Sequence, residues 1–124
     1  MNDKDEPDSK RFLIGVVGPC GSGKSTLIAG LEKEGFKCRH IAQEHSYVPS
    51  MWQKITNPDL LVFLNASFET CTQRRRLNWN NADYQEQQNR LAHALQHADL
   101  IIQTDSLTIE EVQSRVLDFL RAKR

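Results

Sequence analysis

The feature that most constrains this chain is a glycine-rich segment at residues 18–25, which reads GPCGSGKS. It matches the pattern Gly-x-x-x-x-Gly-Lys-Ser/Thr, in which closely wrapped backbone N–H groups hold the oxygens of a polyphosphate. The pattern has this meaning when a strand precedes it and a helix follows it. The apolar run FLIGVV (12–17) comes before it, and residues 25–34 carry apolar side chains at helical spacing and stop at Gly35. The segment therefore predicts a sheet strand, a phosphate-binding turn and a helix.

The rest of the chain continues this alternation of strands and helices. Further strands are expected at 36–42, 60–64 and 100–103, and helices at 50–55, 67–76, 82–96 and from Thr108 onward, where Thr-x-x-Glu forms a capping box. On the 82–96 helix we expect Tyr84, Leu91 and Leu95 to share one face. Four short strands joined by helices predict an α/β fold with a parallel sheet and helices on both faces.

Length and composition indicate one soluble domain. The chain has 124 residues, enough for one core over 11–124, whereas residues 1–10 are acidic and polar and read as a disordered tail. Sixteen basic residues balance sixteen acidic ones, so we expect neither a nucleic-acid nor a membrane partner. The longest apolar runs are too short for a bilayer, and the first ten residues contain no apolar leader. The three cysteines are widely separated, which indicates reduced thiols, and we expect a cytoplasmic protein.

Each residue of the glycine-rich segment has an expected role at a nucleotide. Lys24 brings a positive charge to the β and γ phosphates, Ser25 offers its hydroxyl to Mg²⁺, and Thr26 lies near the α phosphate. Gly21 and Gly23 are expected to tolerate side chains least, and Cys20 is either a small filler or a redox-sensitive thiol. The expected nucleotide-binding residues are Gly18, Pro19, Cys20, Gly21, Ser22, Gly23, Lys24, Ser25 and Thr26.

A nucleotide site also needs a carboxylate, and ligands bind at the carboxyl ends of parallel strands. The strand 60–64 ends in Asn65, while Asp59 and Asp99 precede their strands and belong to the opposite edge. Glu44 and Asp105 remain. Glu44 follows the second strand, where it holds the metal through water, acts as a base, or is an exposed loop acid. Asp105 either serves the site or belongs to the turn before the last helix.

Basic and aromatic residues offer further candidates. Three consecutive arginines at 74–76 fan around a helix, so one or two can face a transferring phosphoryl group, and we assign that role to Arg75. Arg90 is expected near the same cleft, and His45 either orients a substrate or is solvated. Trp79 and Tyr84 either stack on a base or pack in the core.

With these motifs in place, the sequence resembles the small P-loop kinases of the nucleoside monophosphate kinase-like class, which includes shikimate, gluconate, adenylylsulfate and dephospho-coenzyme A kinases. The resemblance covers about residues 11–122 and is most specific at GPCGSGKST. PDLLVFLNASFETCTQRRR looks like the segment that leads into their arginine-bearing lid, and ADLIIQTDSLTIEEVQSRVLDFL looks like their last strand and helix. QEHSYVPSMW is similar to a stretch of short bacterial P-loop proteins of unassigned activity.

The resemblance implies a three-layer P-loop NTPase fold with a reduced, four-stranded sheet, and it implies ATP with Mg²⁺ as cofactor. The stretch between Gln43 and Asp59 is shorter than the acceptor-binding insertion of those kinases, and the acid after the central strand is missing. The resemblance itself implies an ATP-dependent transfer of the γ-phosphate to a small acceptor, and the two departures count against it. The alternatives are a nucleotide-binding regulatory module that acts on a protein partner, and a structural protein with a vestigial loop. GTP is the less favoured nucleotide, since no Asn-Lys-x-Asp motif is present.

Overall fold

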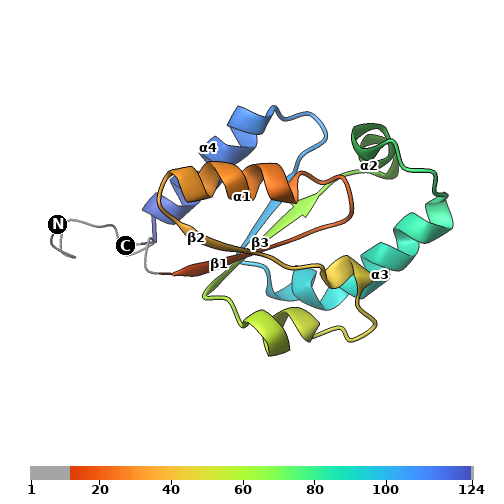
Figure 1. The fold of residues 1–124 in the computed structure, drawn as a ribbon, viewed down its shortest axis with the longest axis horizontal. Coiled ribbons are helices and arrows are strands. Elements are labelled where there is room, and N and C mark those ends of the chain that lie inside the picture. The colour runs from red at the N-terminus through yellow and green to blue at the C-terminus, as the bar shows by residue number, and fades with distance from the viewer. Residues whose placement is uncertain (1–11, 124) are drawn as a thin grey trace, which may run out of the picture.

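The computed structural model describes residues 12–123. Within them, four parallel strands form one sheet in the order β2-β1-β3-β4, so the strand of the glycine-rich segment lies inside the sheet (Figure 1). This confirms the predicted α/β class and the four-stranded parallel sheet. The elements in chain order are β1 (Leu13–Val17), α1 (Lys24–Lys33), β2 (Lys37–His40), η3 (Gln43–His45), η4 (Trp52–Thr56), β3 (Leu60–Asn65), α2 (Phe68–Arg75), α3 (Asn81–His97), β4 (Leu100–Gln103) and α4 (Ile109–Arg121).

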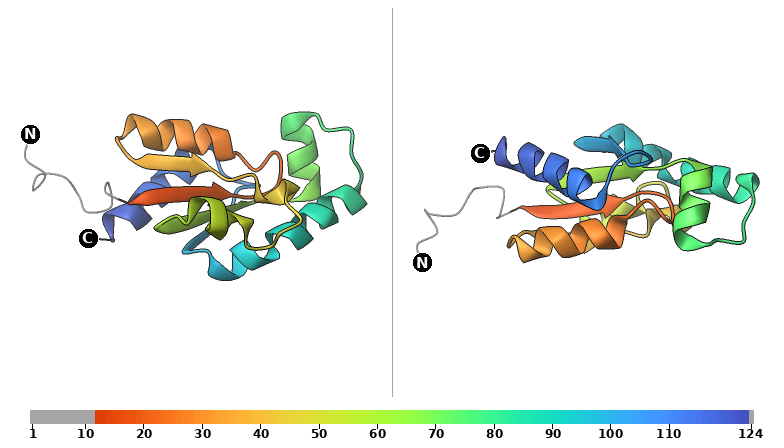
Figure 2. Two further views of the ribbon diagram at one scale, coloured as in Figure 1. Left: turned by 60° about the horizontal axis from the view of Figure 1, so that its bottom comes forward. Right: turned by 90° about the horizontal axis from the view of Figure 1, so that it is seen from above.

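Helices cover both faces of the sheet, as predicted. On one face, Leu27 and Leu31 of α1 and Val116 and Leu120 of α4 pack against alternate residues of the strands. On the other, Trp52 of η4 and Leu91 and Ala94 of α3 pack against the remaining ones. Figure 1 shows α1 and α4 together above the sheet and α3 below it, and Figure 2 shows α2 beyond the carboxyl ends of the strands. The core strand LLVFL is buried on both sides because helices flank both of its faces.

Two predicted elements are present with different bounds, and one local prediction was wrong. The second strand stops at His40, and the chain then bends into the one-turn helix η3. The short helix expected at 50–55 is a single π-helical turn over Trp52–Thr56, and Asn57 ends it in a left-handed conformation. Leu95 was expected on the buried face of α3, but Ala94 and Gln87 are buried there beside Leu91, and Leu95 is exposed. The buried stripe of this helix therefore includes a polar residue, which hydrophobic periodicity does not detect.

The amino ends of the strands are tied by two aspartates, as their positions in the sequence indicated. Asp59 accepts a hydrogen bond from the N–H of Leu13 at 2.7 Å, and Asp99 accepts one from Leu61 at 2.7 Å. Both carboxylates thus lie at the edge opposite the glycine-rich segment and serve the sheet. No helix within residues 12–123 is long and apolar enough to cross a membrane. The tail predicted at 1–10 lies outside the described residues.

Candidate functional site

The turn between β1 and α1 has a backbone that requires glycine. Gly18, Gly21 and Gly23 have φ angles of +155°, +86° and +104°. A Cβ on Gly18 would overlap the carbonyl oxygen of Leu64, and one on Gly21 would lie 2.6 Å from the carbonyl oxygen of Cys71. A Cβ on Gly23 would meet nothing within 4 Å. The prediction for Gly23 therefore needs correction: Gly18 is the more crowded position, because the turn passes directly over the end of β3.

The first turn of α1 leaves N–H groups free for a ligand. Among the described residues, no hydrogen bond uses the N–H groups of Lys24, Ser25 and Thr26, whereas Leu27 donates to the carbonyl of Gly23 at 3.0 Å. The first N–H groups of any helix lack partners within the helix, and the helix dipole makes that end attractive to anions. The side chains of Ser25 and Thr26 are exposed beside them. This end of α1 therefore presents three N–H donors next to two exposed hydroxyl groups.

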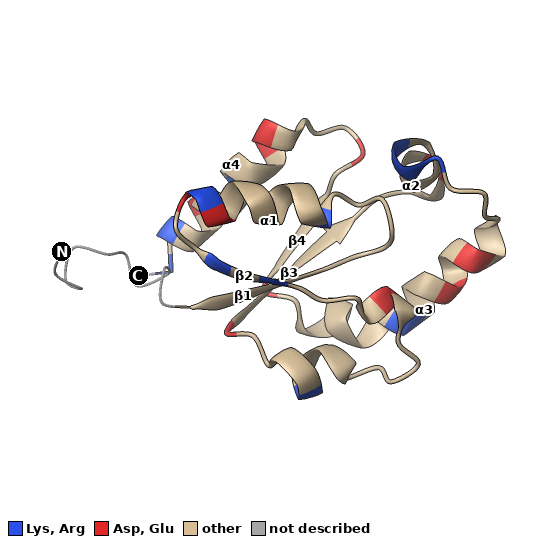
Figure 3. Ribbon diagram, in the orientation of Figure 1, with Lys and Arg blue, Asp and Glu red and all other residues tan. Residues whose placement is uncertain are grey.

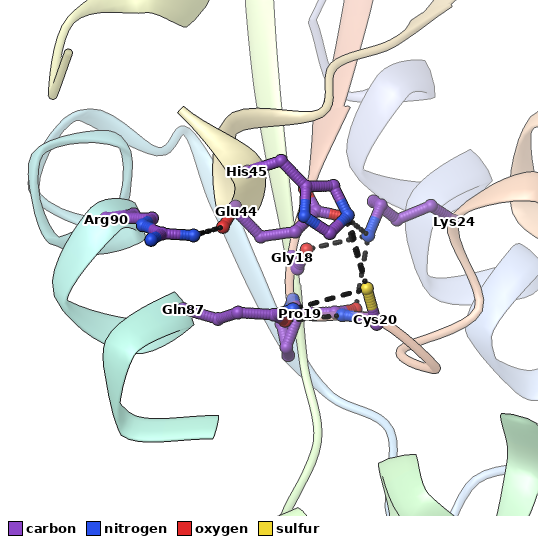
Figure 4. Close-up of polar contacts among 8 residues, drawn as sticks. All are labelled: Gly18, Pro19, Cys20, Lys24, Glu44, His45, Gln87 and Arg90. Atoms are coloured by element: carbon purple, nitrogen blue, oxygen red, sulfur yellow. Dashed lines mark hydrogen bonds and ion pairs between the residues drawn. The ribbon is translucent and has the colours of Figure 1, made fainter. Parts of the chain in front are cut away.

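Lys24 and Glu44 form a buried ion pair at the centre of this arrangement. Lys24 Nζ lies 2.9 Å from Glu44 Oε2, and the two side chains are 5% and 3% exposed. Lys24 also donates to the carbonyls of Gly18 at 2.7 Å and Pro19 at 3.1 Å (Figure 4). The burial of Glu44 excludes the alternative of an exposed loop acid. It lies on η3, which carries it from the end of β2 toward the turn.

The η3 segment is held in place by Gln43 and Arg90. The buried amide of Gln43 accepts a hydrogen bond from the N–H of Trp52 at 2.8 Å and donates to the carbonyls of Val48 and Arg90. Arg90 donates to the main-chain carbonyl of Glu44 at 3.3 Å, and its guanidinium lies 4.4 Å from the centre of the Tyr47 ring. The stretch QEHSYVPSMW is thus a loop fastened to α3, and Arg90 reaches Glu44 through the backbone.

Two residues that the sequence did not single out support the turn by hydrogen bonds. Gln87 accepts a hydrogen bond from the N–H of Cys20 at 3.0 Å (Figure 4). Thr104, also buried, donates to the carbonyl of Ser22 at 3.3 Å. No motif marks either residue. The only signal is that Gln87 is a polar side chain on the buried face of α3, and its function follows from tertiary packing.

An open cavity of about 540 Å³ lies in front of the turn. It is bounded by the turn and the start of α1, by the end of β2 with η3, by α2 and by the start of α4. The lining residues are Cys20, Gly21, Ser22, Gly23, Lys24, Ser25, Thr26, Leu27, His40, Ala42, Glu44, His45, Arg74, Arg75, Thr104, Ile109 and Val112. Of the candidates in the turn, Gly18 and Pro19 do not line the cavity; they act through their carbonyls on Lys24.

The three arginines at the end of α2 have different roles. Arg74 donates to the carbonyl of Thr104 at 2.7 Å and to its hydroxyl at 2.9 Å, so it holds the turn before α4. Arg75 is exposed and lines the cavity, where we assigned it. Arg76 ends the helix in a left-handed conformation. Figure 3 shows this basic end of α2, while acidic and basic residues are mixed over the rest of the ribbon.

Two histidines line the cavity at the end of β2. Partial desolvation, followed by the nearby Lys24 ammonium, lowers the pKa of His40, which favours a neutral ring at pH 7. His45 lies next to Glu44 with its side chain 59% exposed, and its Nε2 is 3.5 Å from Cys20 Sγ. Behind the turn, burial raises the pKa of the Cys71 thiol to about 11. All three cysteines are free thiols, as predicted.

The remaining candidates are structural. Trp79 and Tyr84 pack with Phe68 in a half-buried aromatic cluster at ring separations of 5.9 Å, outside the two core clusters. Neither residue lines the cavity, which favours packing over stacking on a base. The Tyr84 hydroxyl donates to the carbonyl of Ala66 at 2.7 Å. Asp105 accepts a hydrogen bond from the N–H of Ser67 at 2.8 Å, so it belongs to the turn before α4.

The site therefore combines free helix N–H groups, a buried ammonium and one buried carboxylate at an open cavity. This set can bind a polyanion and hold or accept a proton next to it. No protein-family model matches the chain, and no curated protein matches it.

Proposed function

We propose that this chain is a P-loop nucleotide-binding protein that takes ATP with Mg²⁺ and transfers the γ-phosphoryl group to a small acceptor. The observation that carries the proposal is the buried Lys24, which lies under the glycine turn beside three free N–H groups and faces the cavity. A volume of about 540 Å³ is within the range of small-ligand sites. The strand-turn-helix context agrees with the three-layer P-loop NTPase fold that the sequence resembles.

In this proposal, different residues of the chain contact different phosphates of the nucleotide. The N–H groups of Lys24, Ser25 and Thr26 and the dipole of α1 hold the β-phosphate region, and the Lys24 ammonium neutralises charge that develops on the γ-phosphoryl oxygens. Arg75, on the α2 wall of the cavity, adds a second positive charge from the opposite side. Ile109 offers an apolar surface, 60% exposed, at the same cavity.

The residues fit a magnesium ion. Mg²⁺ prefers oxygen ligands, and the Ser25 hydroxyl and the Glu44 carboxylate both line the cavity. Glu44 Oε1 is buried and has no hydrogen-bond partner among residues 12–123, so one carboxylate oxygen is free. Ser25 would hold the ion directly and Glu44 would hold one of its water ligands. When bound, the ion neutralises charge on the β and γ phosphates.

Glu44 is also the residue placed to take the acceptor's proton. In the transfer, the acceptor oxygen bonds to the γ-phosphorus, the bond to the β-γ bridging oxygen breaks, and ADP leaves with that electron pair. The hydroxyl proton passes to the Glu44 carboxylate. Glu44 is the only carboxylate that lines this cavity in the described part of the chain.

A second candidate function, a nucleotide-binding regulatory module, is favoured by one observation. The 46–52 stretch, where an acceptor-binding insertion is expected, is hydrogen-bonded to Gln43 through Val48 and Trp52 and to α3 through the Trp52 indole, which donates to His93. A second cavity is lined by residues of α1 and α4, and none of its lining residues belongs to η3. In this alternative the nucleotide is bound without an acceptor, and its occupancy controls a protein partner.

Titration calorimetry with Mg·ATP and Mg·GTP tests nucleotide binding. Wild type and the matched control Lys54→Met, which changes an exposed lysine on η4, are expected to bind one ATP. Lys24→Met is expected to bind at least about tenfold more weakly, since one charge contact is worth 1.5–3 kcal/mol. Equal affinity of all three proteins, or no binding by any of them, would contradict the proposal.

Acceptor dependence separates the two functions. For a kinase, ADP release rises when a panel of small hydroxyl compounds is added, and Glu44→Gln lowers the rise by about 10²–10⁴ while keeping ATP affinity. For a regulatory module, ADP release is the same with and without acceptors. In that case the transfer part of the proposal fails and the binding part stands.

A further inference from the structure

Three possible metal ligands from two segments meet at the mouth of the turn. They are the Cys20 thiol, the Glu44 carboxylate and the His45 imidazole, and one donor atom of each lies within 4.8 Å of the other two. Cys20 Sγ is 3.5 Å from His45 Nε2 and 3.9 Å from Glu44 Oε2, and His45 Nε2 is 3.9 Å from Glu44 Oε2. Figure 4 shows the three side chains directed toward one another.

The arrangement does not suit a relay in which a base activates the thiol. In such a relay the nucleophile contacts one ring nitrogen of the histidine, and the carboxylate contacts the other. Here the thiol and the carboxylate both approach Nε2 of His45. The three donor atoms therefore converge on one point, as ligands of an ion do.

The triangle has the dimensions of a zinc site. With Zn–S of about 2.3 Å and Zn–N and Zn–O of about 2.0–2.1 Å, tetrahedral angles require ligand separations of about 3.3–3.6 Å. The three separations in the structure are 3.5, 3.9 and 3.9 Å. Side-chain shifts of a few tenths of an ångström are enough to close the triangle around an ion.

Two further features favour an ion at this point. The Glu44 side chain is 3% exposed, and its Oε2, the oxygen that faces Cys20 and His45, is shared with Lys24 Nζ. The other oxygen, Oε1, has no hydrogen-bond partner in the described part of the chain, so the carboxylate is incompletely satisfied. The His45 side chain is 59% exposed and gives access from solvent. The Gln87 amide donates to Cys20 Sγ at 3.4 Å, which fixes the thiol in the way that outer groups orient metal ligands.

We propose that Cys20, Glu44 and His45 form a binding site for one divalent ion of the zinc class, with water at the fourth position. On binding, the Cys20 thiol releases its proton to solvent and its sulfur bonds to the ion. The ion takes the Glu44 carboxylate from Lys24, whose ammonium keeps the carbonyls of Gly18 and Pro19. The proposal rests on these contacts alone, and it does not depend on nucleotide binding.

Titration of the full chain with Co²⁺ and Zn²⁺, in the absence of nucleotide, tests the site. Co²⁺ bound to a thiolate gives a charge-transfer absorption band in the near ultraviolet, and Zn²⁺ competition gives the zinc affinity. We expect one ion per chain. Cys20→Ser is expected to lose the band, and His45→Ala to bind at least about tenfold more weakly, since even the outer groups of metal sites contribute 10–100-fold.

Matched variants make the result decisive. Cys38→Ser and His40→Ala change a half-buried thiol and a neighbouring imidazole outside the triangle, and both are expected to bind as wild type does. Lys24→Met removes the competing ammonium and is expected to bind Co²⁺ more tightly. The proposal is overturned if Cys20→Ser keeps the band, if Cys38→Ser loses it, or if Lys24→Met does not gain affinity. If Cys20→Ser does not fold, His45→Ala provides the test. Unchanged Co²⁺ affinity of His45→Ala also overturns the proposed site.

Discussion

Replacing Lys24 with methionine tests the ion pair at the centre of the site. In the structure, Glu44 Oε2 accepts from Lys24 Nζ at 2.9 Å, and its next nearest partners are Cys20 Sγ and His45 Nε2, both at 3.9 Å. The carboxylate side chain is 3% exposed, so water cannot replace the lost ammonium without rearrangement. Removing one member of a buried pair costs about 3–5 kcal/mol. We expect Lys24→Met to lose that much free energy of unfolding.

Replacing Glu44 instead of Lys24 is expected to cost less free energy of unfolding. In Glu44→Gln, Lys24 Nζ keeps the carbonyls of Gly18 at 2.7 Å and Pro19 at 3.1 Å, and the glutamine oxygen still accepts a hydrogen bond. The loss is then that of one charged hydrogen bond, about 1.5–3 kcal/mol. The double variant Lys24→Met/Glu44→Leu leaves no uncompensated charge, and we expect it to recover most of the loss of Lys24→Met.

Urea unfolding followed by circular dichroism measures these differences, with Lys54→Met as the control for an exposed lysine. For a domain of this length, 3–5 kcal/mol corresponds to a fall in Tm of roughly 12–20 °C. The reasoning is refuted if Lys24→Met lies within about 1 kcal/mol of wild type, or if Glu44→Gln is the more damaging single change.

Three further predictions concern the backbone, a thiol and a helix cap. Gly18→Ala is expected to cost at least about 2 kcal/mol and Gly23→Ala about 1 kcal/mol, since only the first combines a positive φ with a clash; thermal melts check the order. Burial raises the pKa of the half-buried Cys38 to about 11, so its alkylation should still rise about tenfold per pH unit from pH 8 to 10, whereas an ordinary thiol levels off; mass spectrometry measures the rate. Thr108→Ala removes the hydroxyl that caps α4 and is expected to lower the free energy of unfolding in urea by about 1 kcal/mol. An unchanged free energy of unfolding would show that this cap does not stabilise the helix.

The fold was largely predictable because its signals are local. An apolar run such as LLVFL, a glycine turn and a capping box each act within a few residues, and strand-helix alternation then leaves little freedom in topology. The predictions failed where a tertiary contact replaced a local rule. Gln87 and Ala94 occupy the buried face of α3, where we expected Leu95. Gln87 is buried there because its side chain accepts a hydrogen bond from the N–H of Cys20.

The site was predictable in its composition and less so in its contacts. Lys24 and Ser25 follow from the motif itself, and Glu44 follows from its place after β2. The burial of Glu44 was not predictable, because it depends on Gln43 and Arg90, which join η3 to α3 across more than forty residues of sequence. Among the three arginines, helix geometry limited how many can face the site, but only the fold shows that Arg74 is tied to Thr104.

The measurement that tests the central claim most directly is an amide NMR titration of the ¹⁵N-labelled chain with Mg·ATP. The claim is that the free N–H groups at the start of α1 hold the phosphates. We predict the largest shifts at Lys24, Ser25 and Thr26, saturating at one ATP per chain, with small shifts at Trp79 and Tyr84. Saturating ATP that leaves the amides of Lys24, Ser25 and Thr26 unmoved would contradict the account.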